Sequence, residues 1–253
     1  MSHRKTFLKL WGIVCLSIIS SASYADVVQI ATASNFRASF EALITDYEKK
    51  SLRPIYASSG KLIAQIRHGA PIDIFLSAES IGKNLPEELV IKDSEFTYAY
   101  GQLALAGRLS QTKSTEQTLE SPRTLECLAI ANPSLAPYGR AAKQVIRLLE
   151  NKGWIFERIV KGQSVAQAFQ FFDSGACSNA LVAYAQVLAN AKSIEHTLIP
   201  STWHNPIQQN AILLKRAENN PEALRFFEFL KSQEARKIIR DSGYLMFSDT
   251  KDR

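Results

Sequence analysis

The chain has 253 residues, of which 46% are hydrophobic, and a formal net charge of +6 at pH 7. This length is enough for one large domain or two smaller ones, each with its own hydrophobic core. The excess of basic residues is mild for such a length and forms no continuous stripe, which argues against a nucleic acid as the partner.

The N-terminus has the pattern of a secretory signal peptide, and we expect residues 1–25 to be removed from the mature protein. Three basic residues precede a short apolar run at 11–19, and Ser23-Tyr24-Ala25 forms a small-x-small cleavage site. The apolar run is too short to remain as a membrane-spanning helix. We therefore predict export of the mature chain, and the alternative is a retained N-terminal anchor.

Strand-like and helix-like patterns alternate in the first part of the mature chain. Strands are expected at 27–31, 54–57, 72–76 and 96–106, and helices at 36–50 and 60–68. Gly69 is placed to end the second helix. The run at 72–76 shows little alternation of polarity, which is typical of a parallel strand that is buried on both faces.

The same alternation continues to the end of the chain. Strands are expected at 127–131, 155–160, 180–184 and 209–215, and helices at 139–151, 165–173, 221–229 and 233–241. Strands that alternate with helices predict the α/β fold class with parallel sheets.

Two of the turns that join a strand to a helix are rich in hydroxyl and amide side chains. Ser34 and Asn35 follow the first strand, and Ser58 and Ser59 follow the second. The N–H groups at a helix start are unpaired and carry a partial positive charge, so such turns favour anions. Each residue alone could be an ordinary N-cap. Both turns, however, fall at the C-terminal ends of strands, where open α/β sheets bind their ligands.

Two later turns repeat this arrangement. The segment 131–139 contains two prolines, which fix the backbone before a helix begins. Gly162-Gln163-Ser164 precedes a further helix, whose start would direct the N–H of Val165 outward. Four helix starts from two halves of the chain would suit one small anion.

The sequence carries no G-x-S-x-G elbow and no Gly-rich phosphate loop before a lysine, so we expect no enzyme. None of the three histidines of the mature chain has a second ligand at metal spacing, so no directly coordinated metal is expected. Arg37 and Lys61 follow the first two turns and could touch an anion, although solvated positions on the first helical turn are favoured for both.

These turns, with the segments between them, resemble the periplasmic molybdate-binding proteins of ABC importers, which are type II periplasmic binding proteins. The most distinctive segment is 69–78, with the sequence GAPIDIFLSA. The other similar segments are 31–34 (ATAS), 57–66 (ASSGKLIAQI), 132–139 (NPSLAPYG) and 162–168 (GQSVAQA). The resemblance covers essentially the whole mature chain, and the segments occur in the same order.

The resemblance implies a two-lobed periplasmic-binding-protein fold of the α/β class. Each lobe would be a mostly parallel sheet flanked by helices, and the ligand would lie in the cleft between the lobes. The first lobe is expected to be discontinuous and to comprise 26–104 plus 208–253, and the second lobe to comprise 105–207. The late strand at 209–215 is compatible with such a discontinuous lobe.

The resemblance also implies the residues that bind a tetrahedral dianion. Ser34 and Ser59 match two serines that donate hydrogen bonds from the first lobe. Tyr138 and Val165 match positions in the second lobe that contribute backbone N–H groups. Tyr184 matches a tyrosine whose hydroxyl completes the site in many members of the family.

The first turn departs from the family pattern, because Thr32 and Asn35 stand where other members often carry alanine and an apolar residue. Asn35 and Ser58 are therefore secondary candidates for ligand contacts. A fully deprotonated dianion only accepts hydrogen bonds, so a site made of donors disfavours protonated anions. Neutral donors also avoid the desolvation cost of a buried arginine or lysine. Molybdenum would thus be bound as its oxyanion.

The expected function is capture of molybdate, and of tungstate as well, for delivery to a membrane-embedded ABC permease. We expect a periplasmic monomer without a cofactor. The nearest alternative is the same fold binding another tetrahedral oxyanion such as sulfate. Alternatives from other classes are an exported phosphate-ester hydrolase and a sensor lobe that signals to a receptor.

Cys127 and Cys177 are the two cysteines of the mature chain, and we expect them to form a disulfide. Export to an oxidising compartment permits such a bond. Each cysteine precedes an apolar strand, and the starts of these strands would lie side by side if the strands are parallel neighbours, as in the resembling fold. The alternative is a pair of unrelated buried thiols.

Overall fold

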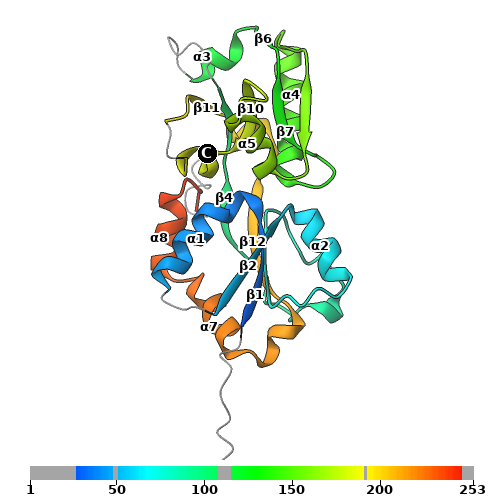
Figure 1. The fold of residues 1–253 in the computed structure, drawn as a ribbon, viewed down its shortest axis with the longest axis vertical. Coiled ribbons are helices and arrows are strands. Elements are labelled where there is room, and N and C mark those ends of the chain that lie inside the picture. Colours follow the sequence, from blue (N-terminus) through cyan, green and yellow to red (C-terminus); the bar gives the residue numbers. More distant parts are fainter. Residues whose placement is uncertain (1–26, 48–50, 108–114, 191–192, 247–253) are drawn as a thin grey trace, which may run out of the picture.

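Two five-stranded sheets, one beyond the other along the long axis of the molecule, organise the fold (Figure 1). The computed structural model describes residues 27–47, 51–107, 115–190 and 193–246. The expected signal peptide at 1–25 lies outside these ranges. None of the helices within them is long and apolar enough to cross a membrane.

The first sheet has the strand order β2-β1-β3-β12-β4. Its strands are β1 (Val28–Ala33), β2 (Leu52–Ala57), β3 (Ile74–Ser77), β4 (Phe96–Gly101) and β12 (Ile207–Leu213). β1 is parallel to both β2 and β3, whereas β12 is antiparallel to its neighbours β3 and β4. β12 therefore runs against the other strands, and the sheet is mixed although most of its strands share one direction.

Helices cover both faces of the first sheet. Three helices share one buried cluster with β1 and β3, namely α1 (Arg37–Asp46), α7 (Pro221–Phe229) and α8 (Gln233–Asp241). α2 (Ser59–Arg67) packs on the opposite face. Successive side chains of a strand point to opposite faces. Ile74 therefore belongs to the first cluster, and Phe75 contributes to the cluster under α2.

The second sheet has the order β11-β5-β10-β7-β9. Its strands are β5 (Leu103–Ala106), β7 (Leu128–Ala131), β9 (Ile159–Gly162), β10 (Asn179–Ala183) and β11 (His196–Leu198). β7 is parallel to β9 and β10, and β5 runs antiparallel to both of its neighbours. The main helices beside this sheet are α4 (Pro137–Asn151), α5 (Val165–Asp173) and the short α6 (Tyr184–Leu188).

Shorter elements complete the described chain. A two-stranded parallel sheet pairs β6 (Thr124–Leu125) with β8 (Ile155–Phe156), and α3 spans Thr115–Glu120. The 3-10 helices are η1 (Ser34–Phe36), η2 (Glu87–Leu89), η3 (Ser201–Trp203) and η4 (Lys215–Asn219).

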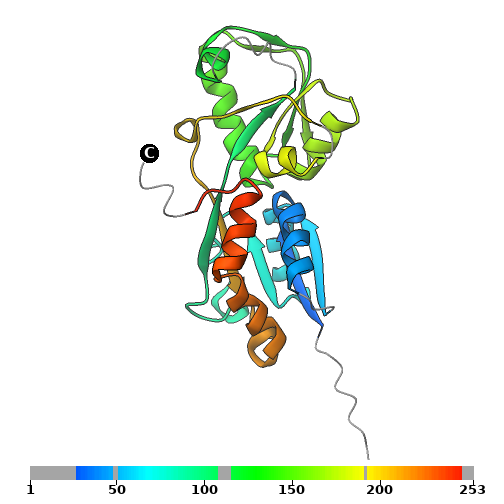
Figure 2. The same cartoon turned by 90° about the vertical axis from the view of Figure 1, so that its left-hand side faces the viewer.

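The chain passes between the two sheets twice, as Figure 2 shows. We expected a single strand at 96–106, but the structure divides it at Gln102 into β4 of the first sheet and β5 of the second. The apolar pattern runs through the break, so it does not reveal the change of sheet. The return passage lies between β11 and β12.

Two other expected strands are also shorter than predicted. The strand expected at 155–160 becomes β8 and β9, because the chain leaves its pairing with β6 and then joins β7. Tyr184, expected as the last residue of a strand, is the first residue of α6.

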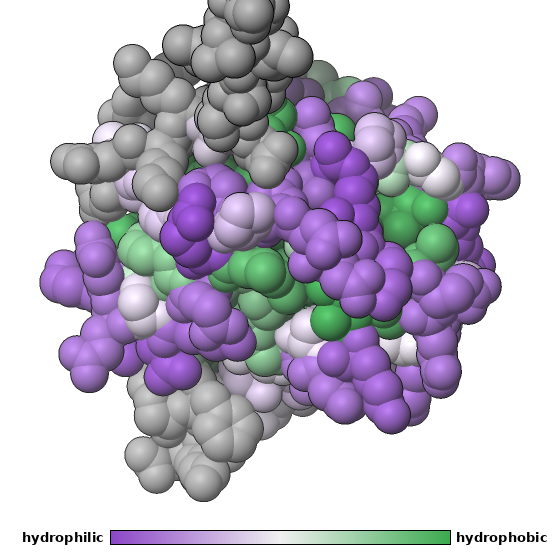
Figure 3. Space-filling view, turned by 90° about the horizontal axis from the view of Figure 1, so that it is seen from below, coloured by the Kyte–Doolittle hydropathy of each residue, from purple (hydrophilic) through white to green (hydrophobic). Residues whose placement is uncertain are grey.

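Seen from below in Figure 3, hydrophilic residues surround smaller groups of hydrophobic ones on the end of the molecule nearest the first sheet. Large hydrophobic side chains with substantial exposure include Val27, Ile55 and Leu224 in this part of the chain. They belong to different segments, and isolated exposed hydrophobic residues are normal on soluble proteins.

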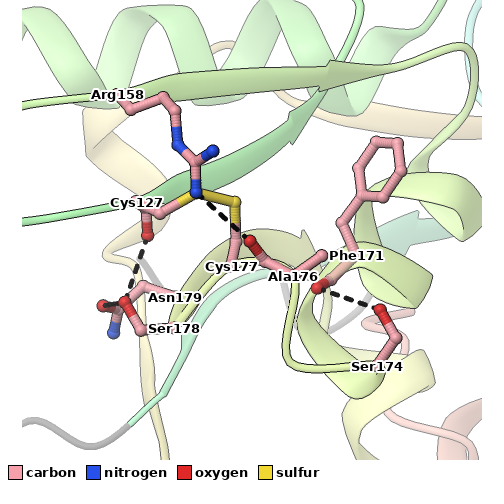
Figure 4. The surroundings of a disulfide bond; sticks show 8 residues. All are labelled: Cys127, Arg158, Phe171, Ser174, Ala176, Cys177, Ser178 and Asn179. Atoms are coloured by element: carbon pink, nitrogen blue, oxygen red, sulfur yellow. Dashed lines mark hydrogen bonds between the residues drawn. A yellow bond between two sulfur atoms is a disulfide. The ribbon is translucent and has the colours of Figure 1, made fainter.

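A disulfide joins Cys127 to Cys177 in the second sheet, with the Cα atoms 5.0 Å apart (Figure 4). Each cysteine precedes a strand, and these strands, β7 and β10, are parallel neighbours with Leu128 opposite Asn179. The bond therefore ties together the starts of two strands. The helix α4 follows the other end of β7, so the disulfide lies at the far end of the sheet from that helix start.

Candidate functional site

The starts of four helical segments meet between the two sheets. α1 with its leading turn η1, and α2, begin at the end of the first sheet that faces the second (Figure 1). The N–H of Gly60 in α2 donates to the carbonyl of Leu135, just before α4, over 3.0 Å. Lys61 donates to the side chain of Gln163, just before α5. Because η1 also packs against α5, the four starts form one cluster.

Ser34 and Asn35 lie in η1, and both are buried. Asn35 Nδ2 donates to Gln209 Oε1 over 2.7 Å and to the hydroxyl of Tyr244 over 3.0 Å. The Tyr244 hydroxyl in turn donates to the carbonyl oxygen of Asn35 over 3.0 Å. Both amide hydrogens of Asn35 are thus in use, so this residue can offer an anion its backbone N–H but not its side-chain amide.

Ser58 and Ser59 lie at the start of α2 and are likewise buried. Ser59 Oγ accepts the N–H of Ala78 over 3.0 Å, which leaves the hydroxyl hydrogen of Ser59 available to a ligand. Ser58 has the N-cap position of α2, but its side chain makes no capping hydrogen bond. Its hydroxyl oxygen is buried without a partner among the described residues.

Tyr138 and Val165 present backbone donors from the second lobe. Pro137 is the first residue of α4 and has no N–H, so Tyr138 supplies the first N–H of that helix. Val165 is the first residue of α5, where the Ser164 side chain accepts the N–H of Gln167 instead. The N–H groups of Tyr138 and Val165 donate to no other backbone group among the described residues.

The side chain of Tyr138 has its own surroundings, distinct from those of its backbone N–H. Its hydroxyl is buried without a partner in the described part of the chain. It packs directly over Gly101, where a Cβ would overlap the hydroxyl oxygen. Burial, followed by the neighbouring Tyr244 and Tyr98, raises the pKa of Tyr138 well above its ordinary value, so this hydroxyl stays neutral.

Tyr184 is the first residue of α6 and lies outside the four helix starts described above. Its helix, α6, packs against η1. Its ring, however, lies against His196, with the ring centroids 5.3 Å apart, and beside Gly243. No hydrogen bond joins the Tyr184 hydroxyl to the described residues at the four helix starts.

The buried carboxylate of Asp73 has a structural role. It precedes β3 and accepts the N–H of Gln29 over 2.7 Å, and Arg216 forms an ion pair with it. These contacts lie at the starts of β1 and β3, away from the helix starts. Within the described ranges, no group of three or more potential metal-ligating side chains could hold a metal ion.

A family model described as "Bacterial extracellular solute-binding protein" matches residues 28–245. The chain belongs to this family.

Two relatives of this solute-binding protein are named as molybdate-binding protein ModA. The protein from Azotobacter vinelandii is 32% identical over 90% of this chain and 93% of its own length. The protein from Rhodobacter capsulatus is 33% identical over 87% of this chain and 89% of its own length. Both matches span nearly all of each chain.

The solved structure of the Azotobacter vinelandii periplasmic molybdate-binding protein matches with a TM-score of 0.72 and 30% identity. The match covers 87% of this chain and 99% of that one, and it confirms the predicted two-lobed α/β fold. A sulfate-binding protein from Mycobacterium tuberculosis has a TM-score of 0.65 but only 12% identity, so this likeness shows the fold alone.

Three residues of the site were missed from the sequence. Gln209 and Tyr244 fix the side chain of Asn35, and Gly101 makes room for Tyr138. Gln209 is fully buried in the strand β12, but it lies between Gln208 and Asn210, so the local sequence does not set it apart from its polar neighbours. Tyr244 gave no local signal either, because it contacts Asn35 across 209 positions of sequence.

Proposed function

We propose that this solute-binding protein captures molybdate in the periplasm and delivers it to a membrane-embedded ABC permease. The observation that carries the proposal is the cluster of four helix starts, which offers hydroxyl and backbone donors without a buried carboxylate at the described helix starts. The relatives that match over most of their length are named for molybdate binding, which supports this choice among oxyanions.

In this proposal the ligand is held by donors from both lobes. Ser34 and Ser59 donate their hydroxyls, and Tyr138 and Val165 donate their backbone N–H groups. The Tyr184 hydroxyl is a fifth donor that would have to turn away from His196. Hydrogen bonds to a charged acceptor are each worth about 1.5–3 kcal/mol, so four or five of them suffice for tight binding.

Asn35 and Ser58, the secondary candidates, have different roles in this proposal. Asn35 acts through its backbone N–H, because its amide hydrogens are held by Gln209 and Tyr244. Ser58 borders a cavity beside the site, and its hydroxyl oxygen is buried without a partner among the described residues. Tungstate has the same charge and shape as molybdate and is a second ligand in this proposal.

We also propose the division into lobes of 26–104 plus 208–253 and of 105–207. The change of sheet at Gln102 and the start of β12 at Ile207 lie within two residues of these limits and support them. We further propose that the protein is exported, is cleaved after Ala25, is a monomer and carries no cofactor.

Titration calorimetry of the mature protein with molybdate, tungstate, sulfate and phosphate tests the ligand. We expect one-to-one binding of molybdate and tungstate, with weaker binding of the other two. Molybdate at a hundred times its Kd should stabilise the fold by about 2.7 kcal/mol, measured as a rise in Tm. Tighter binding of sulfate would keep the site and change the ligand, and turnover of a phosphate ester would favour the hydrolase instead.

A further inference from the structure

A cavity opens beside the proposed binding site. It has a volume of about 280 Å³ and lies between the starts of α1, α2 and α5. Ser34 and Ser58 border it from the first lobe, and Gln163 and Ser164 border it from the second. Ser34 thus belongs both to this cavity and to the proposed inner site. We call this cavity the outer pocket.

Two cations border the outer pocket, and neither forms an ion pair with a carboxylate of the described chain. Arg37 lies over the ring of Tyr56, with its guanidinium carbon 5.0 Å from the ring centroid. Lys61 donates to the neutral side chain of Gln163. Glu41 lies one turn after Arg37, but its carboxylate accepts the hydroxyl of Tyr56 over 2.6 Å. Neither cation is thus directly paired with a carboxylate in the described chain, and both place positive charge at the edge of the pocket.

Ser58 adds a buried polar side chain beside the outer pocket. Ser58 is only 3% exposed and borders the outer pocket, yet its oxygen has no hydrogen-bond partner within the described residues. A buried hydroxyl without a partner is unfavourable, and a ligand that accepts its hydrogen removes this cost.

We propose that the outer pocket is an encounter subsite, where Arg37, Lys61 and Ser58 first hold the incoming divalent oxyanion before it reaches the inner site. This inference rests on the proposed function. Lys61 and Gln163 belong to different lobes, so their hydrogen bond forms only when the lobes are together. In the open protein Lys61 is free for the anion, and on closure it exchanges the anion for Gln163.

The inner site and the outer pocket would have different roles, because the inner site has neutral donors and the outer pocket has cations. The inner site is made of neutral donors, which bind tightly without the cost of desolvating a buried cation. Neutral donors attract a distant anion only weakly, whereas exposed cations act over about a Debye length and raise the association rate. The outer pocket would therefore set how fast the anion binds, and the inner site how long it stays.

Stopped-flow fluorescence with molybdate tests the inference on Arg37→Gln, Lys61→Gln and the double variant. At low ionic strength we expect the association rate to fall about threefold for each change and about tenfold for both. The dissociation rate should remain within about twofold of the parent's. Above about 0.5 M salt the association rates should converge, because the charges are then screened.

Arg67→Gln is the matched control, because Arg67 is an exposed cation in the last turn of α2, at the opposite end from Lys61. It removes the same charge and should leave both rates unchanged. Calorimetry over the same salt series provides an equilibrium readout, in which the Kd of the double variant should rise by the factor by which its association rate falls.

An unchanged association rate in the double variant would overturn the inference, as would an equal loss in Arg67→Gln. A faster dissociation with normal association would also overturn it, since the cations would then hold the bound anion. Failure of the parent protein to bind molybdate would instead refute the proposed function, so the two failures are distinguishable.

Discussion

The hydroxyl group of Ser59 accepts one hydrogen bond within the protein and still has its own hydrogen to donate. Its oxygen accepts the N–H of Ala78, and its hydroxyl hydrogen is left for a ligand. Ser34, across the site in η1, is also buried and borders the outer pocket. In the proposed site, single hydroxyl groups would therefore contribute much of the binding energy.

We expect Ser34→Ala and Ser59→Ala each to weaken molybdate binding about ten- to a hundredfold, because each removes a bond worth about 1.5–3 kcal/mol. Calorimetry measures the affinity, and thermal unfolding checks that both variants fold. Ser59→Ala should also lower stability by about 1 kcal/mol, since the Ala78 N–H loses its acceptor. Ser174→Ala, at the exposed far end of α5, is the control. Parental affinity in both site variants would show that the site lies elsewhere.

The backbone N–H of Tyr138 is expected to contact the ligand, whereas its side-chain hydroxyl is not. We expect Tyr138→Phe to keep the parental affinity for molybdate, because the proposed contact is the N–H, which this change retains. It should unfold at the same temperature as the parent or slightly higher, since the hydroxyl it removes is buried without a described partner. Gly101→Ala should destabilise the fold by about 1–3 kcal/mol, because its Cβ would overlap that hydroxyl. A tenfold loss of affinity in Tyr138→Phe would assign the contact to the hydroxyl.

Local sequence predicted the residues at the helix starts well, because a cap and a hydroxyl-rich turn leave their signal within a few positions. The partners of Asn35 could not be predicted in the same way. Gln209 is 174 positions from Asn35, and Tyr244 is 209 positions away. Such contacts depend on how β12 and the chain after α8 pack on η1, and no local pattern encodes that packing.

Among the elements, β4 and β5 show what hydrophobic periodicity cannot predict, namely where a strand is broken. Both consist largely of apolar and aromatic residues, so the pattern predicted one continuous strand at 96–106. The structure breaks it at Gln102, where the carbonyl accepts the N–H of Tyr184 and the side chain donates to the carbonyl of Gly243. The break thus depends on contacts from both lobes. The longer elements that begin and end within one lobe, such as α2, α4 and α5, were predicted to within a few residues, whereas the short α3, β6, α6 and β11 were not predicted.

The disulfide between the starts of β7 and β10 should contribute to stability but not to molybdate binding. Reduction of the Cys127–Cys177 bond should lower the free energy of unfolding by up to about 4 kcal/mol, because it closes a loop with a sequence separation of 50. Denaturant unfolding with and without reductant measures this loss. The Cys127→Ala/Cys177→Ala double variant should keep the parental affinity for molybdate, since the bond lies at the far end of the sheet from the start of α4. A large loss of affinity would contradict this separation.

For the purified protein, mass spectrometry after alkylation under non-reducing denaturation tests whether the bond forms in the periplasm. We expect no alkylated thiol in the mature chain. Two alkylated cysteines would show that the thiols remain reduced there.

At the scale of the whole molecule, several polar contacts near the helix starts join the described parts of the two lobes. Gly60 donates to Leu135, Lys61 donates to Gln163, and Arg140 forms an ion pair with Glu79 over 2.6 Å. The backbone contact at Gly60 leaves little space, since a Cβ there would lie 2.9 Å from the Leu135 carbonyl oxygen. The structure therefore has the lobes in contact around the site.

The position of β12 has a consequence for the order of folding. β12 is the strand partner of both β3 and β4, although it follows the entire second sheet in the chain. A chain that emerges from its N-terminus can complete the second sheet from residues 103–198, while β4 still lacks a strand to pair with. Long-range pairings of this kind form late, because closing the long intervening loop costs entropy.

We therefore expect the amides of β7 and β10 to become protected from hydrogen exchange before those of β4 when the unfolded protein refolds. Pulsed exchange followed by mass spectrometry measures this order. Until 207–213 arrive, β3 and β4 would present open strand edges, which promote association between chains. The topology that brings both halves of the chain to one anion would thus make a chain that has only partly emerged dependent on protection from aggregation.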